Sequence, residues 1–319
     1  MKKFLYILAV SSILFLSCEE NFSPKGEFEQ KYALTCVIRG DTALQVAAIY
    51  GNYNVEGYDP SVFDGNTAYD GADIRLWYQD TVYVFKDSVV SNPNLPDSNF
   101  RFYYLDNFKP EAPGEPMEIE AMLKNGKRLR ASCETPSRLL FDLNETSNTI
   151  PAVNTPTVNI FWKTEDVNNF YIARIKVKYI QNVNGINVHR WLELPKRLLR
   201  NDDNEIPIYP TPSKIYSISY DQDAIDFAMR SISDNVPNKN SITLSTLAII
   251  EVLSLEENLT RYYSSTLEDN NYTVRVNETD YSNVEGGFGI FGSLNKSTKK
   301  ISLLASYIES FGYNVLYEN

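Results

Sequence analysis

The chain has 319 residues, of which 43% are hydrophobic and 22% are charged, and its formal net charge is −11. This length is sufficient for two domains with separate cores, and the composition is that of a globular protein. A strongly acidic protein repels phosphate backbones, which excludes nucleic acid as an expected partner. The 22 Tyr and 16 Phe against 4 Met favour a chain rich in β-strands.

Residues 1–18 have the features of an export signal. Lys2 and Lys3 precede an apolar run, 4–16, that is short for a transmembrane helix, and Cys18 directly follows the small residue Ser17. This order resembles the signal of bacterial lipoproteins, in which the new N-terminal cysteine is acylated. An ordinary signal peptide cut elsewhere is the alternative. Because several acyl chains together give a stable anchor, we expect lipidation at Cys18 to hold the protein on a membrane.

Residues 19–31 are expected to form a polar tether. The tether starts with Glu19 and Glu20, and acidic residues at this place resemble the surface-export signal of Bacteroidota lipoproteins. That resemblance implies a lipid-anchored protein on the outer face of the outer membrane. A plain polar spacer is the alternative.

Residues 32–142 contain strand patterns only and predict an N-terminal β-sandwich of the immunoglobulin or transthyretin type. The expected strands are 32–39, 45–50, the hairpin 72–85, 100–105, 117–123 and 128–133. In the last pair, only a three-residue loop with Gly126 in the left-handed conformation keeps the core face apolar, so we expect a bulged hairpin. Residues 143–156, polar and interrupted by two prolines, predict a linker.

Residues 157–319 predict a second sandwich, loosely similar to fibronectin type III, with two inserted helices. One helix is expected after Asp221, and the other after a capping box that starts at Ser254. The expected strands are 157–162, 171–179 with its hairpin partner, 243–253, 272–276, 286–293 and 299–304. The whole chain is therefore expected to be all-β with minor helices.

Motifs that carry chemistry are weak in this chain. Residues 287–292 match the dinucleotide pattern G-x-G-x-x-G, but no helix pattern follows, so these glycines are expected to allow a bulge or a close backbone approach. His189 is the single histidine and is expected on a strand surface. The acidic run 202–205 lacks the spacing of a calcium loop. We therefore expect no catalytic residue, no metal and no cofactor.

The loop 52–70 is rich in aromatic residues, among them Tyr53, Tyr58, Phe63 and Tyr69. Such side chains suit stacking on sugar rings or lining a protein contact; ordinary surface tyrosines of a sandwich are the alternative. We expect a ligand or partner to bind here, with the loop projecting away from the lipid.

Cys36 and Cys133 remain after Cys18 is acylated, and both lie on expected strands, at the start and the end of the first domain. An exported compartment permits a disulfide between them, and two buried free thiols are the alternative.

Five stretches, in order, resemble one family over nearly the whole chain: the acidic start after Cys18, YALTCVIRG, AYDGADIRLWYQD, KNGKRLRASCETP and YSNVEGGFGIFGS. They are similar to the Bacteroidota outer-membrane lipoproteins of domain-of-unknown-function family 4249. Cys36 and Cys133 stand where that family is expected to have Val-like and Thr-like residues, which fits a disulfide peculiar to this branch. The resemblance implies a lipoprotein often encoded beside TonB-dependent transporters, and it implies no catalytic residues.

We therefore expect a non-catalytic, surface-exposed outer-membrane lipoprotein that serves as an accessory or binding component of a TonB-dependent transport system. Its expected partners are the outer membrane, through the lipid anchor, and the transporter, while a small-molecule or glycan ligand is not identified. A structural or adhesive surface protein is the alternative, and a secreted hydrolase is a more distant one.

Overall fold

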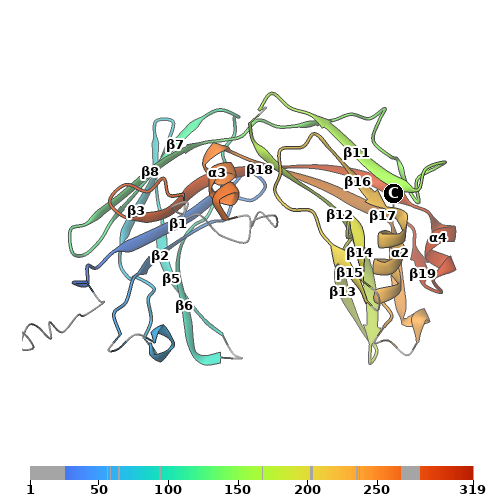
Figure 1. Cartoon of the computed structure of the whole chain (residues 1–319), viewed down its shortest axis with the longest axis horizontal. Coiled ribbons are helices and arrows are strands. Elements are labelled where there is room, and N and C mark those ends of the chain that lie inside the picture. Colours follow the sequence, from blue (N-terminus) through green and yellow to red (C-terminus); the bar gives the residue numbers. More distant parts are fainter. Residues whose placement is uncertain are drawn as a thin grey trace, which may run out of the picture.

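The computed structural model describes residues 26–318, apart from 56, 58, 64, 93–94, 167, 202–203, 235, 237 and 267–280. Strands make up 52% of the structure and helices 11%, so the predicted all-β class with minor helices is confirmed. Two lobes lie at the ends of one long curved sheet and give the molecule the outline of an arch (Figure 1). Within these residues no helix has the length and apolar character needed to cross a membrane.

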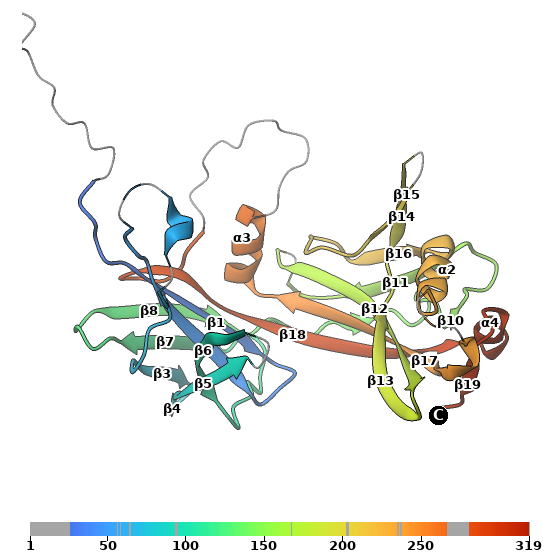
Figure 2. The ribbon, with the colours of Figure 1, turned by 90° about the horizontal axis from the view of Figure 1, so that it is seen from below.

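One ten-stranded sheet runs through both lobes (Figure 2). Its strands, in spatial order, are β13 (Ile186–Glu193), β12 (Phe170–Val183), β17 (Ile242–Leu255), β18 (Phe288–Leu303), β1 (Tyr32–Arg39), β2 (Gln45–Gly51), β6 (Leu95–Leu105) and β5 (Lys86–Asn92), with β10 (Thr149–Ile150) beside β18 and β19 (Asn314–Leu316) beside β17. Apolar residues alternate along these strands, so that one face of the sheet is apolar and packs against the two cores. Residues 143–156, expected to be a linker, thus contribute β10 to the sheet.

Strand β18 joins the two lobes. Its first half pairs parallel with β1, where Leu34 lies opposite Gly289, and its second half pairs antiparallel with β17. We predicted residues 286–293 as a strand of the second sandwich, but the structure places them beside β1, with Phe291 buried in the first core. The glycines of this stretch explain the difference, because they allow β18 to approach the backbone of the first lobe closely.

The first lobe packs its part of the long sheet against a second sheet of four strands. These are β4 (Thr81–Val84), β3 (Asp73–Tyr78), β7 (Pro116–Met122) and β8 (Arg128–Glu134). Both predicted hairpins are confirmed: Leu76 lies opposite Tyr83 in the first, and a three-residue loop sets Ala121 opposite Leu129 in the second. Gly126 has the expected left-handed conformation, with a φ of +81°.

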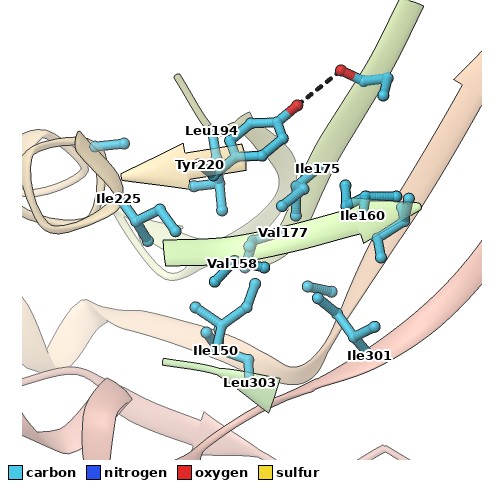
Figure 3. Packing of buried hydrophobic residues seen from close by; sticks show 14 of the residues in the cluster. Ile150, Val158, Ile160, Ile175, Val177, Leu194, Tyr220, Ile225, Ile301 and Leu303 are labelled. Carbon is cyan, nitrogen blue, oxygen red and sulfur yellow. Dashed lines mark hydrogen bonds between the residues drawn. The ribbon is translucent and has the colours of Figure 1, made fainter. Parts of the chain in front are cut away.

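The second lobe packs its part of the long sheet against β16 (Ser217–Asp221), β11 (Thr157–Lys163), β9 (Leu140–Phe141) and helix α2 (Gln222–Ser231). Figure 3 shows Val158 and Ile160 of β11 facing Ile175 and Val177 of β12. The hairpin β14 (Arg197–Asn201) and β15 (Asn204–Ile208), the 3-10 turn η3 (Lys239–Ser241) and helix α4 (Ala305–Ser310) complete this lobe. The strand predicted at 272–276 lies outside the described residues.

The predicted start of α2 is confirmed, whereas the predicted start of the next helix is wrong. Helix α2 has Asp221 at its N-cap position, as expected, but the carboxylate makes no capping hydrogen bond. The capping box predicted at Ser254 is wrong, because Ser254 belongs to β17 and pairs with Asn295 of β18. Helix α3 (Glu257–Thr266) is capped instead by Glu256, whose carboxylate accepts hydrogen bonds from the backbone N–H groups of Asn258 and Leu259, at 2.8 and 2.9 Å.

Candidate functional site

The aromatic loop 52–70 starts beside residues 29–31, which belong to the segment expected to be a tether. The side-chain oxygen of Asn52 accepts a hydrogen bond from the backbone N–H of Lys31, at 2.7 Å, and its amide group donates to the backbone oxygen of Glu29, at 2.8 Å. The side chain of Gln30 in turn donates to the backbone oxygen of Asn52, at 3.0 Å. Asn52 therefore holds residues 29–31 against the loop, at one end of the first lobe (Figure 2). We expected the loop to project away from the lipid; in the structure the start of the loop lies beside residues 29–31, and the direction of the loop relative to a lipid stays a prediction.

Among the residues predicted to contact a ligand or partner, Tyr53 and Phe63 lie on the loop surface, whereas Tyr69 packs into the lobe. Tyr53 and Phe63 stack on each other, with ring centroids 4.1 Å apart and an interplanar angle of 17°, and Tyr53 is 42% exposed. The turn η2 (Pro60–Val62) ends on Val62, which is 60% exposed beside this pair in the chain. Together they form an apolar surface on the loop. Tyr58 lies outside the described residues, as does Cys18.

Tyr69, the fourth predicted contact residue, is directed into the lobe. Its hydroxyl accepts a hydrogen bond from the backbone N–H of Lys124, at 2.8 Å, and its ring packs edge-on against Tyr32, with centroids 5.3 Å apart. Tyr69 thus fastens the end of the loop to the β7–β8 turn. The Tyr69 ring therefore contributes to packing inside the lobe. Sequence composition alone does not distinguish such a residue from an aromatic residue that contacts a partner.

A polar cleft between the lobes is a second candidate site, and it was not predicted. A cavity of about 600 Å³ opens where residues 132–137, 165–166, 168–169 and 256–258 meet. Carboxylate and amide side chains dominate its wall: Glu134, Glu165, Asp166, Glu256, Glu257, Asn168, Asn169, Asn258 and Asn283. No Lys or Arg is among its described lining residues. Such a wall offers many hydrogen-bond acceptors and suits a ligand that brings donors or positive charge.

Two asparagines fix the geometry of this cleft. The amide groups of Asn258 on α3 and Asn283 both donate to the backbone oxygen of Ser132 on β8, each at 3.1 Å. Asn283 also exchanges two hydrogen bonds with the backbone of Phe291 on β18, at 2.7 and 2.9 Å. The first turn of α3, β8 and β18 are therefore held as one unit at the junction of the lobes.

Glu256 is the most perturbed carboxylate in the cleft. Its side chain is almost fully buried, and burial raises its pKa to about 7, although the hydrogen bonds from the N–H groups of Asn258 and Leu259 act in the opposite direction. Glu256 is therefore partly protonated at neutral pH. Because its oxygens already cap α3, we assign it a role in positioning the helix at the cleft.

The two cysteines are buried free thiols in the structure, so the expected disulfide is not formed. Cys36 on β1 and Cys133 on β8 lie in the same core, and Cys133 also borders the cleft. Burial raises the pKa of Cys36 to about 12 and that of Cys133 well above its ordinary value. Because thiolate is the species that reacts, these thiols are poor partners for oxidation and poor nucleophiles.

The fold accounts for the places of the other residues that the sequence singled out. His189 is exposed on β13, as predicted, and the glycines of 287–292 lie against β1 and α3. Within the described ranges, no group of three or more His, Cys, Asp or Glu side chains has an arrangement that would hold a metal ion. The loop 52–70 and the inter-lobe cleft are thus the two candidate contact sites.

No protein-family model and no curated protein matches the chain. Among solved structures, the crystal structure of DIP-gamma IG1+IG2 is similar over 86% of this chain and 97% of that one, with 7% sequence identity and a TM-score of 0.18. A similarity at this TM-score carries no argument about fold or function.

Proposed function

We propose that the protein is a lipid-anchored outer-membrane protein of the family 4249 type that acts as a non-catalytic accessory or binding component of a TonB-dependent transport system. The observation that carries this proposal is the place of the Tyr53–Phe63 pair on the loop that residues 29–31 contact, which lipidation at Cys18 would make the tethered end of the first lobe. A partner embedded in the same membrane would meet this end first.

The tether length supports a membrane-proximal contact. Lipidated Cys18 would stand 30 − 18 = 12 residues before Gln30, which is bound to Asn52 of the loop. A fully extended chain of that length spans at most about 40 Å. The loop therefore stays within reach of the surface-exposed parts of a transporter in that membrane.

The loop also has the composition of a protein contact. Aromatic side chains are enriched at interfaces because they bury a large area with few rotatable bonds. Tyr53, Phe63 and Val62 together offer such a surface, and Tyr50 on the adjacent β2 is 42% exposed as well. We place the transporter contact on this surface and the ligand of the binding component in the inter-lobe cleft.

Deleting residues 54–66 is expected to abolish co-purification with an outer-membrane transporter while the fold is kept. The two ends of the loop are already joined, since the N–H of Gly51 donates to the backbone oxygen of Thr67 at 2.8 Å, so a shorter connection is possible. The measurement is affinity purification of tagged protein from detergent-solubilised outer membranes, with the bound transporter quantified by mass spectrometry.

The matched control replaces two exposed apolar residues on the other lobe, Val183→Ser with Ile186→Ser, at the β12–β13 turn. This variant should retain the transporter, and a double variant Tyr53→Ser with Phe63→Ser should lose it at least about tenfold, the equivalent of about 1.4 kcal/mol. The proposal is wrong if wild-type protein never brings down a transporter, or if the deletion and the control behave alike.

A further inference from the structure

A groove of about 380 Å³ lies on the long sheet, on the face turned away from the second core. Its lining residues are Lys178, Trp191, Leu247, Ile249, Lys300 and Glu318. Four adjacent strands, β13, β12, β17 and β18, supply the first five. Their neighbours along the chain, such as Val177, Ala248 and Ile301, are buried in the second core, which places the groove on the opposite face.

An irregularity in strand pairing lies at the groove. Val177 lies opposite Ala248, whereas Tyr179 lies opposite Leu244, so three residues of β17, 245–247, oppose Lys178 alone. Bulges of this kind interrupt the ladder and re-aim side chains, and they are over-represented beside functional sites. Here the bulge separates Lys178 from the regular ladder at the position where Glu318 reaches the sheet.

Glu318 is held in a fixed place on the groove wall. Its carboxylate accepts a hydrogen bond from the hydroxyl of Ser245, at 2.8 Å, and one from the ammonium group of Lys178, at 3.4 Å. Its backbone N–H donates to the hydroxyl of Thr246, at 3.2 Å. The Ser245 hydrogen bond and the charges of Lys178 and Lys300 hold the pKa of Glu318 below its ordinary value, so the carboxylate is ionised and accepts hydrogen bonds.

Two features of the groove point to a ligand. The indole of Trp191 is 56% exposed on the sheet face, beside the partly buried side chains of Leu247 and Ile249. Among the described lining residues, the two ammonium groups of Lys178 and Lys300 stand against the single carboxylate of Glu318, so the groove is locally positive in a protein of net charge −11. An anionic ligand with an apolar face is complementary to this combination.

We propose that this groove binds an acidic saccharide, a hexuronate-containing chain. The apolar C–H face of a sugar ring would lie on the Trp191 indole, the ring carboxylate would pair with Lys300, and hydroxyl groups would donate to Glu318. A simple aromatic or fatty carboxylate lacks those hydroxyl donors and would leave the Glu318 carboxylate against an apolar surface, which is unfavourable. This inference does not depend on the transporter contact.

The test uses the full chain in detergent and follows tryptophan fluorescence. The probes are tetragalacturonate, an oligoglucuronate, and the methyl ester of tetragalacturonate, which keeps the ring but removes the charge. We expect saturable binding of the acids, at least about tenfold weaker binding of the ester, and the same loss for Lys300→Gln. Trp191→Ala should abolish binding, measured for this variant by calorimetry because its reporter is removed.

The control variant is Lys299→Gln. Lys299 is the preceding residue on β18, and its ammonium group donates to the side chain of Asn148, at 3.2 Å, so it belongs to the other face of the sheet. This variant should bind the acids as the wild type does. The proposal is overturned if neither acid binds up to about 10 mM, if acid and ester bind equally, or if Trp191→Ala binds like the wild type.

Discussion

Replacing Gly289 by alanine is expected to destabilise the protein by at least about 3 kcal/mol, because the new Cβ atom would have no room. Gly289 has a φ of +110°, and a Cβ atom built there would lie 2.0 Å from the backbone oxygen of Leu34 and 2.8 Å from its carbonyl carbon. These are atoms of the paired strand β1, so relief requires that the β1–β18 pairing opens. The measurement is the free energy of unfolding in denaturant.

The matched control is Gly126→Ala in the β7–β8 turn. Gly126 also has a positive φ, +81°, but a Cβ atom there would meet no other atom within 4 Å. This change should therefore cost only the left-handed conformation, about 1–2 kcal/mol. Equal losses for the two variants would contradict the close approach of β18 to β1.

The same contact explains the glycine motif of 287–292. A Cβ atom on Gly287 would lie 2.4 Å from the backbone oxygen of Tyr32, and one on Gly292 would lie 2.6 Å from a carboxylate oxygen of Glu256. The interpretation that these glycines allow close backbone approach is thus confirmed. They are what allows the last long strand to complete the first lobe.

The second large effect concerns pH and Glu256. Burial raises the folded-state pKa to about 7 from an ordinary value of 4.5, so between these values the folded protein holds a proton that the unfolded chain has released. Stability must therefore fall as pH rises through this window, by about 3 kcal/mol from this group. The measurement is the free energy of unfolding at pH values between about 4 and 8.

Two variants isolate this effect. Glu256→Gln removes the titrating group and should flatten the decline between about pH 4.5 and 7. Glu257→Gln, a change at the adjacent exposed residue, removes only a weak like-charge contribution to the raised pKa of Glu256, so most of the decline should remain. A decline of equal size in the Glu256→Gln variant would show that the buried carboxylate is not its cause.

At acidic pH the free energy of unfolding is expected to change in the opposite direction, because the pKa of Asp41 is lowered in the folded protein. Burial alone would raise the pKa of Asp41, but hydrogen bonds from Arg39 and Lys296 and their charges outweigh it and hold the pKa at about 2. Stability from this group is present above the unfolded value of 3.8 and is lost as pH falls toward 2. Both groups together predict a stability maximum between about pH 4 and 5.

The hairpins were predictable from sequence because their registers depend on residues that are close in the chain. Only one alignment of 117–123 with 128–133 makes both core faces apolar, and the structure has that alignment. The participation of β18 in both lobes was not predictable in this way. It joins residues about 250 positions apart, Leu34 and Gly289, and local patterns contain no information about such pairs.

The candidate sites also depend on contacts between residues that are distant in the chain, which local patterns do not predict. The loop with Tyr53 and Phe63 was recognisable by composition, but its place beside residues 29–31 depends on Asn52, which contacts them across more than twenty positions. The inter-lobe cleft combines segments from both lobes and has no local signature. Ser254 was assigned to a cap because its sequence context fits one, yet the paired strands β12 and β18 extend β17 past it.

The most direct test of the proposed function is site-specific photo-crosslinking in intact cells. A photoreactive residue would replace Tyr53 in the loop, and in a separate strain Ile186, which is 69% exposed on the other lobe. We expect crosslinks from position 53 to an outer-membrane transporter and none from position 186. Transporter crosslinks from position 186 alone, or from neither position, would contradict a transporter contact at the tethered end.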